Sequence, residues 1–80
     1  MTALTPLPEH SRAVLCEDRP EAGLRVGDVG TVVHVYSEGA GYEVEFVAQS
    51  GHTVAVLTLP SAAVRAVEPT EELVARVLAA

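Results

Sequence analysis

The chain has 80 residues, enough for one small domain, and its net charge of −6 comes from eleven acids against five bases. All five bases are arginine. Nucleic-acid affinity depends mainly on basic side chains that contact phosphates, so this composition argues against binding to nucleic acid. It also argues against binding to an anionic membrane surface, and it favours a basic protein partner.

The content of cysteine and apolar residues narrows the class of protein further. Cys16 is the single cysteine, whereas small secreted domains usually carry several disulfides. The first residues show no signal-peptide pattern, and no stretch reaches the roughly 18 apolar residues of a membrane helix. We therefore expect a cytoplasmic protein without a membrane segment. The 49% hydrophobic content and the fourteen valines predict a folded, strand-rich chain.

The first third of the chain predicts one strand and one long acidic loop. Residues 1–9 contain two prolines and are expected to form a flexible lead-in. The apolar run at residues 12–16 predicts the first strand. The loop that follows, residues 17–28, contains four acids, and Leu24 and Val26 are expected to anchor it. Loops of this length are often functional or fold back on themselves.

The centre of the chain predicts a β-hairpin. Residues 27–30 form a glycine-punctuated turn that leads into a β-branched strand over 29–36, and a glycine-rich turn at 37–41 leads into the next strand over 42–47. The second of these strands alternates in polarity, which is typical of an antiparallel strand with one buried face. We expect the core to receive Tyr42, Val44 and Phe46, and the solvent to receive Glu43 and Glu45.

The remaining sequence predicts two more strands and a helix. Residues 53–59 are apolar on both faces and predict the fourth strand, residues 60–63 predict a 3₁₀ turn, and residues 64–67 predict the last strand. Residues 69–80 predict a short C-terminal helix with an apolar stripe of Leu73, Val74, Val77 and Leu78. So short a helix must dock, either on its own barrel or on a second chain.

The order of these elements is typical of an SH3-like barrel. It has a long loop after the first strand, tight turns after the second and third, and a 3₁₀ turn before the last. We therefore predict an all-β fold, a small five-stranded SH3-like barrel over residues 10–68 with a short C-terminal helix.

A resemblance to known families supports this prediction. SH3-like and KOW-type barrels have a turn-and-strand signature that resembles the run Gly27-Asp28-Val29-Gly30-Thr31-Val32-Val33. The longer pattern begins at Leu24, continues to Tyr36 and ends in Tyr42-Glu43-Val44-Glu45-Phe46. It is similar to a bacterial family of short proteins classed as a domain of unknown function. The resemblance covers residues 12–67; it implies the fold and carries no activity.

Residues that could carry chemistry are explained more simply by structure. His10, His34, His52 and Cys16 show no short metal-ligand spacing, and Cys16 is interpreted as a small buried apolar residue. The glycine turn at 27–30 could bind an anion, but no helix follows it. No nucleophile, base and oxyanion hole are recognisable together. We therefore expect no enzyme activity, no metal and no cofactor.

The remaining function is binding of another protein. The candidate partner-binding residues are Glu17, Asp18 and Glu21 in the acidic loop and Leu73 and Val77 on the C-terminal stripe. The chain has only three aromatic residues, so polyproline binding is not expected. The sequence predicts a non-catalytic protein–protein interaction module, such as an acidic accessory or antitoxin-like protein. Alternatives are a structural or assembly subunit of a larger enzyme and, third, an RNA-binding barrel. The sequence defines neither the partner nor the oligomeric state.

Overall fold

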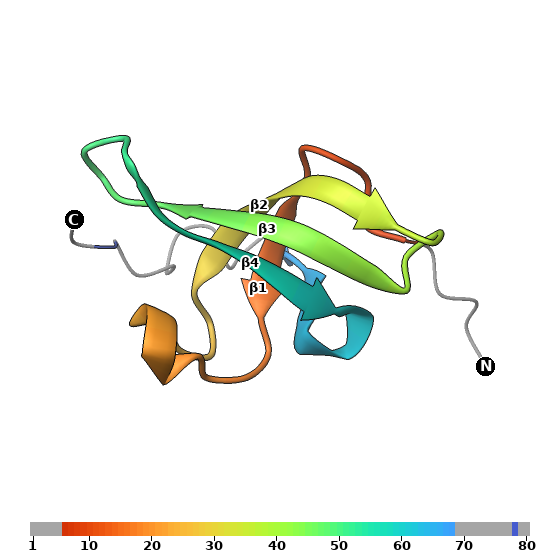
Figure 1. Cartoon of the computed structure of the whole chain (residues 1–80), viewed down its shortest axis with the longest axis horizontal. Helices are drawn as coiled ribbons and strands as arrows, with labels where there is room; N and C mark the ends of the chain where they lie inside the picture. The colour runs from red at the N-terminus through yellow and green to blue at the C-terminus, as the bar shows by residue number, and fades with distance from the viewer. Residues whose placement is uncertain (1–5, 69–77, 79–80) are drawn as a thin grey trace.

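A computed structural model describes residues 6–68 and residue 78 (Figure 1). In this part of the chain, five strands form one open antiparallel sheet in the order β4-β3-β2-β1-β5. The strands are β1 (Arg12–Leu15), β2 (Val29–Tyr36), β3 (Gly41–Val47), β4 (Thr53–Pro60) and β5 (Val64–Ala66). The 3₁₀ helix η1 (Pro20–Ala22) lies between β1 and β2, and η2 (Ser61–Ala63) lies between β4 and β5.

The all-β prediction is confirmed, and the strands lie within one residue of their predicted bounds. β2 spans the predicted residues, whereas β1 ends one residue early, at Leu15. The described residues contain no α-helix, and none of their helices is long and apolar enough to cross a membrane. The predicted C-terminal helix over 69–80, with Leu73 and Val77, lies outside the described residues except for Leu78.

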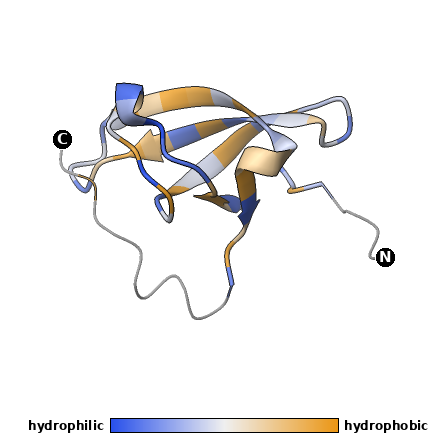
Figure 2. Cartoon of the chain, turned by 90° about the horizontal axis from the view of Figure 1, so that it is seen from below, coloured by the Kyte–Doolittle hydropathy of each residue, from blue (hydrophilic) through white to orange (hydrophobic). Residues whose placement is uncertain are grey.

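The core lies on one face of the central strands. Along β3, Tyr42, Val44 and Phe46 are buried, as predicted. The two glutamates between them, which were predicted to face the solvent, are half-buried. Val44 pairs with Val32 of β2 on one side and with Leu57 of β4 on the other, so β3 has apolar neighbours on both sides. Hydrophobic and hydrophilic residues alternate along the strands in Figure 2. The pleat of β3 therefore organises the core.

Gly30 has a packing role that the sequence did not reveal. A Cβ atom at this position would lie 2.6 Å from Cγ1 of Val44 and 2.8 Å from the backbone oxygen of Glu45. The positive φ expected of this turn is found at Gly27, where φ is +95°. Gly27 thus permits the turn, and Gly30 permits β2 to approach β3 closely.

The loop between β1 and β2 folds back on itself, and only one of its two predicted anchors is buried. Arg19 and Leu24 exchange two backbone hydrogen bonds, of 2.8 and 3.0 Å, and this arrangement turns Leu24 into the core. Val26 was expected to be a second anchor, but it is 58% exposed. Asp28 is buried instead, and its Oδ2 accepts a 3.0 Å hydrogen bond from the Arg25 backbone N–H.

Cys16 is exposed, so its interpretation as a buried apolar residue is wrong. Ala13 and Leu15 belong to the core cluster. Alternation along the strand therefore directs the next side chain to the other face. That face is not covered at Cys16 because β1 has ended and the Cys16 backbone N–H bonds to the carbonyl oxygen of Ala63 at 2.7 Å.

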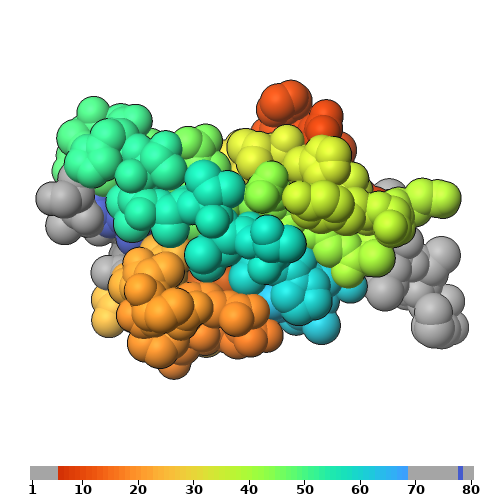
Figure 3. Space-filling view, in the orientation of Figure 1, coloured from red at the N-terminus to blue at the C-terminus, as the bar shows by residue number. Residues whose placement is uncertain are grey.

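β4 lies at one end of the sheet order and is largely exposed. In Figure 3 its residues, in teal, cross the visible face of the molecule beside the orange residues of the β1–β2 loop. Its side chains are apolar or hydroxylic, yet Leu59 is its one fully buried residue and Val56 is 50% exposed.

Candidate protein-binding groove

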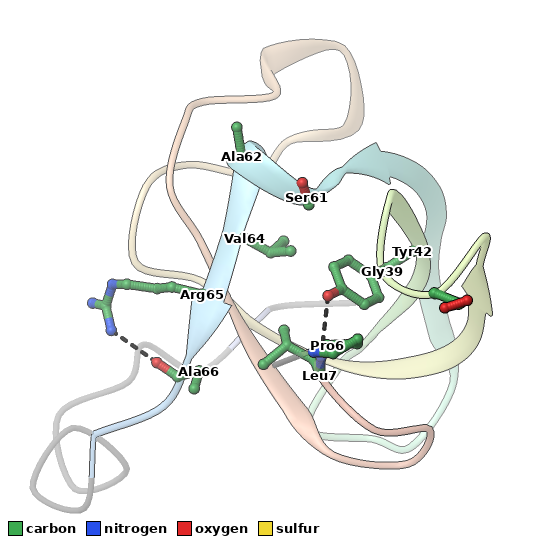
Figure 4. A pocket seen from close by; sticks show the side chains of 10 residues that line it. Pro6, Leu7, Gly39, Tyr42, Ser61, Ala62, Val64, Arg65 and Ala66 are labelled. Carbon is green, nitrogen blue, oxygen red and sulfur yellow. Dashed lines mark hydrogen bonds between the residues drawn. The ribbon is translucent and has the colours of Figure 1, made fainter. Parts of the chain in front are cut away.

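A groove of about 460 Å³ lies between four segments that are distant in the sequence. Its walls come from the N-terminal residues Pro6 and Leu7, the β2–β3 turn, η2 and β5. Figure 4 shows these segments around the side chains of Tyr42 and Val64. The volume lies in the range of sites that hold small molecules or a few peptide side chains.

The lining of the groove is mainly apolar. Tyr42 and Val64 are buried, and Leu7 is half-buried against the core cluster. The Tyr42 hydroxyl oxygen accepts a 3.0 Å hydrogen bond from the Leu7 backbone N–H. Arg65 directs its guanidinium away from the groove, where Nη1 donates to the Ala66 backbone oxygen at 3.1 Å. The groove therefore offers a mainly apolar surface, and Glu38 and Arg65 are its charged lining residues.

The β2–β3 turn has the sharp backbone geometry that one wall of the groove requires. Ser37, Glu38 and Gly39 all have positive φ, and at Gly39 the value is +101°. A Cβ atom on Gly39 would lie 2.9 Å from Cβ of Pro6. Glycine is thus required here both for its backbone conformation and for contact with the N-terminal segment.

η2 connects the groove to the acidic loop. The Ser61 backbone N–H donates to the Ala40 carbonyl oxygen at 3.2 Å, which ties η2 to the β2–β3 turn. At its other end, Ala63 accepts the hydrogen bond from Cys16, the residue directly before Glu17. The acidic loop therefore begins beside one wall of the groove.

The three predicted acidic residues lie together on this loop and are exposed. Asp18 Oδ1 accepts a 2.9 Å hydrogen bond from the Val26 backbone N–H, and Glu17 Oε2 lies 3.3 Å from Nη2 of Arg19. Glu21 is in η1. These contacts connect parts of the loop to one another, and the side chain of Val26 is exposed at its surface.

The other two predicted partner-binding residues, Leu73 and Val77, lie outside the described residues. The residues around the groove were not singled out in the sequence as a site, because its walls come from segments that no local pattern connects. The alternation of β3 did indicate that Tyr42 points inward, but it could not show that Leu7 would cover it.

The histidines and the cysteine have separate neighbours. The ring of His34 packs edge-on against Tyr36, with centroids 4.4 Å apart, and Ser50 Oγ lies 3.1 Å from Nδ1 of His52. Cys16 Sγ lies 3.8 Å from the backbone oxygen of Val14. Among residues 6–68 and 78, no three His, Cys, Asp or Glu side chains gather closely enough to hold a metal ion.

A family model described as "Domain of unknown function (DUF4926)" matches residues 9–66. The chain belongs to this family. Searches of curated proteins and of solved structures gave no match. The DUF4926 region includes the sheet, the acidic loop and η2, whereas Pro6 and Leu7 precede it.

Proposed function

We propose that this DUF4926 chain is a non-catalytic protein–protein interaction module that binds a basic segment of a partner protein. The observation that carries the proposal is the hydrogen bond between Cys16 and Ala63, which joins the start of the acidic loop to η2, one wall of the apolar groove. A partner segment that fills the groove with apolar side chains can then present basic side chains to the loop.

The two parts of this surface would contribute differently to binding. Burial of apolar area in the groove, against Tyr42 and Val64, would supply most of the affinity. Glu17, Asp18 and Glu21 are exposed, so their attraction to a basic partner would mainly raise the association rate and select against acidic partners. The net charge of −6 acts in the same direction.

We infer that the fold that carries this surface is an SH3-like barrel, and three features support this inference. The sheet order places β5 beside β1, a long loop joins β1 to β2, and a 3₁₀ helix joins β4 to β5. The exposed thiol of Cys16 is consistent with a reducing, cytoplasmic location.

The predicted C-terminal helix, with Leu73 and Val77, is proposed as a second contact surface. Leu78 is 7% exposed and belongs to the core cluster, and its backbone oxygen accepts a 3.2 Å hydrogen bond from Gln49. This contact shows that Leu78 packs on its own sheet, so a partner would have to be contacted by other residues of the predicted helix.

Titration of the isotope-labelled protein with designed peptides tests the proposed binding mode. One peptide has an apolar centre and basic flanks, the second has the same centre and acidic flanks, and the third has a polar centre and basic flanks. We expect only the first to shift the backbone amide signals of both the groove and the acidic loop at about 0.15 M salt.

Paired charge reversals identify the surface. Glu17→Lys with Glu21→Lys should weaken binding of the apolar-basic peptide several-fold, and most strongly at low salt. Glu43→Lys together with Glu45→Lys makes the same change of net charge on β3, outside the loop, and is the control. Equal weakening by both pairs would mean that the acidic loop affects binding only through the net charge of the chain. Absence of binding by all three peptides would contradict the proposal.

A further inference from the structure

The N-terminal strap, residues Pro6–Pro8, contributes Pro6 and Leu7 to the wall of the groove. Pro6 packs against Gly39, and the Leu7 backbone N–H bonds to the Tyr42 hydroxyl at 3.0 Å. Leu7 is half-buried and contacts the core cluster. A proline-leucine-proline segment is thus seated in an extended apolar site by one leucine and one backbone hydrogen bond.

Leu7 lines two hollows. One is the groove of about 460 Å³, and the other is a hollow of about 370 Å³ that Leu7 and Pro8 line together with Arg12, Ala66 and Val67. Ala66 lines both hollows, so both follow the same strand, β5. Without the strap, the two hollows would become one longer apolar channel beside β5.

The strap is attached through a tight turn and precedes the family domain. The Pro8 backbone oxygen accepts hydrogen bonds from Ser11 Oγ, at 2.6 Å, and from the Ser11 backbone N–H, at 3.1 Å. His10, with φ of +71°, donates its backbone N–H to Val32 of β2 at 2.6 Å. The family match begins at residue 9. The turn therefore anchors the C-terminal end of the strap to the sheet, while Leu7 is held by its side-chain packing and by one backbone hydrogen bond.

We propose that the strap is an internal competitor for the binding channel. The segment that displaces it is an extended peptide of the partner with a leucine-like side chain and a free backbone N–H at the position of Leu7. The leucine of this peptide would take the place of Leu7, and its N–H would bond to the Tyr42 hydroxyl. The specific anchor is an aliphatic side chain and not a proline ring, because Leu7 reaches the core.

This inference deepens the proposed function and rests on it for the nature of the partner. The tether gives the strap a high effective concentration, so an external peptide binds only in proportion to the fraction of molecules whose channel is open. Release of the strap should therefore strengthen external binding. The module would be held at low affinity until a partner of suitable sequence arrives.

The test uses the sequence of the strap itself as the probe, a synthetic peptide with residues 4–10, Leu-Thr-Pro-Leu-Pro-Glu-His. The full chain and its Leu7→Asp variant, which disfavours the docked strap, are titrated with this peptide by isothermal calorimetry. We expect the variant to bind roughly tenfold more tightly than the native chain, since half-burial of a leucine and one hydrogen bond no longer oppose the peptide. Equal affinities, or no binding to either chain, would overturn the proposal.

Matched variants show whether the peptide occupies the channel. Ala62→Arg in the Leu7→Asp background places a long side chain at an exposed position of the groove wall and should abolish binding. Gln49→Arg, at an exposed position of the β3–β4 turn, should leave binding unchanged. A probe with Asp in place of its second leucine should bind none of these chains. If Leu7→Asp impairs folding, Leu7→Ser tests the same expectation without a buried charge.

Hydrogen exchange of the native chain provides a direct measure of displacement. The Leu7 amide should be protected in the free protein and become exposed when the probe binds. The competitor role of the strap and the proposed binding function can fail independently of each other. If the apolar-basic peptide of the previous section binds the native and the Leu7→Asp chains equally, the binding function holds and the competitor role is wrong. If the strap peptide alone binds, the channel is real and the basic partner is wrong.

Discussion

β1 is more buried than β4, although the sequence of β4 is the more apolar of the two. β1 has four residues, one of them charged, and three of the four are buried. β4 has eight residues, none of them charged, and one is buried. β1 lies between β2 and β5, whereas β4 is the last strand of the sheet. Burial in this small domain therefore depends more on the position of a strand in the sheet than on its hydropathy.

The largest test of this comparison is removal of a side chain from an inner strand. Phe46 is fully buried on β3, between β2 and β4. Phe46→Ala should lower the free energy of unfolding by roughly 3–5 kcal/mol, through lost burial and the cavity that remains. That is a large part of the stability of a small domain, so a substantially unfolded variant is an acceptable result. A loss below 1 kcal/mol in urea unfolding would show that the core is not centred on β3.

The second test compares two leucines, one in the core and one on the edge strand. Leu78 is buried, whereas Leu57 of β4 is half-buried. Leu78→Ala should destabilise the protein by about 2 kcal/mol or more, as is usual for a buried leucine. Leu57→Ala should cost about half as much. Thermal unfolding of both variants ranks them, and the reverse order would place Leu78 outside the cooperative core.

The third test separates the close approach of inner strands from backbone conformation. Gly30→Ala should cost about 1–3 kcal/mol because the new Cβ overlaps Val44. Gly51→Ala should cost about 1–2 kcal/mol for a different reason, since φ is +95° there and the position is otherwise open. A double-mutant cycle with Val44→Ala should partly relieve the first cost and leave the second unchanged.

The smallest effect is expected on the edge strand. Val56→Lys should change the free energy of unfolding by less than about 0.5 kcal/mol, because the side chain is half-exposed. The charge should also reduce association through the open edge of β4 in concentrated solution. Light scattering during a concentration series measures this second effect. A loss of more than 1 kcal/mol would mean that β4 is buried as its hydropathy suggests.

The strand pattern could be predicted from sequence because its signals are local. Alternation along residues 42–47 identified the inward face of β3, and the glycine turns located the hairpin. The errors at Cys16 and Val26 arose where a strand or loop leaves the sheet, since burial there depends on which distant segment covers the position. The backbone of Cys16 bonds to Ala63 and that of Val26 bonds to Asp18, and neither contact can be seen in the local hydropathy.

The candidate site was predicted only in its acidic part. Glu17, Asp18 and Glu21 stand close together in the sequence, so their charge is visible without a structure. The groove is assembled from the N-terminus, a hairpin turn, a 3₁₀ helix and the last strand, and the contact between Pro6 and Gly39 spans the first half of the chain. Nothing in the composition of residues 1–9 indicated that Leu7 would pack on Tyr42.

The exposed position of Cys16 has a practical consequence. It is the single thiol of the chain, and its backbone connects the acidic loop to the 3₁₀ helix at the groove wall. A fluorophore attached there would stand at the junction of the two surfaces, labelled at one site without any engineered substitution. Its emission would report arrival of a ligand at either surface, which makes the unaltered protein its own sensor in a screen for binding partners.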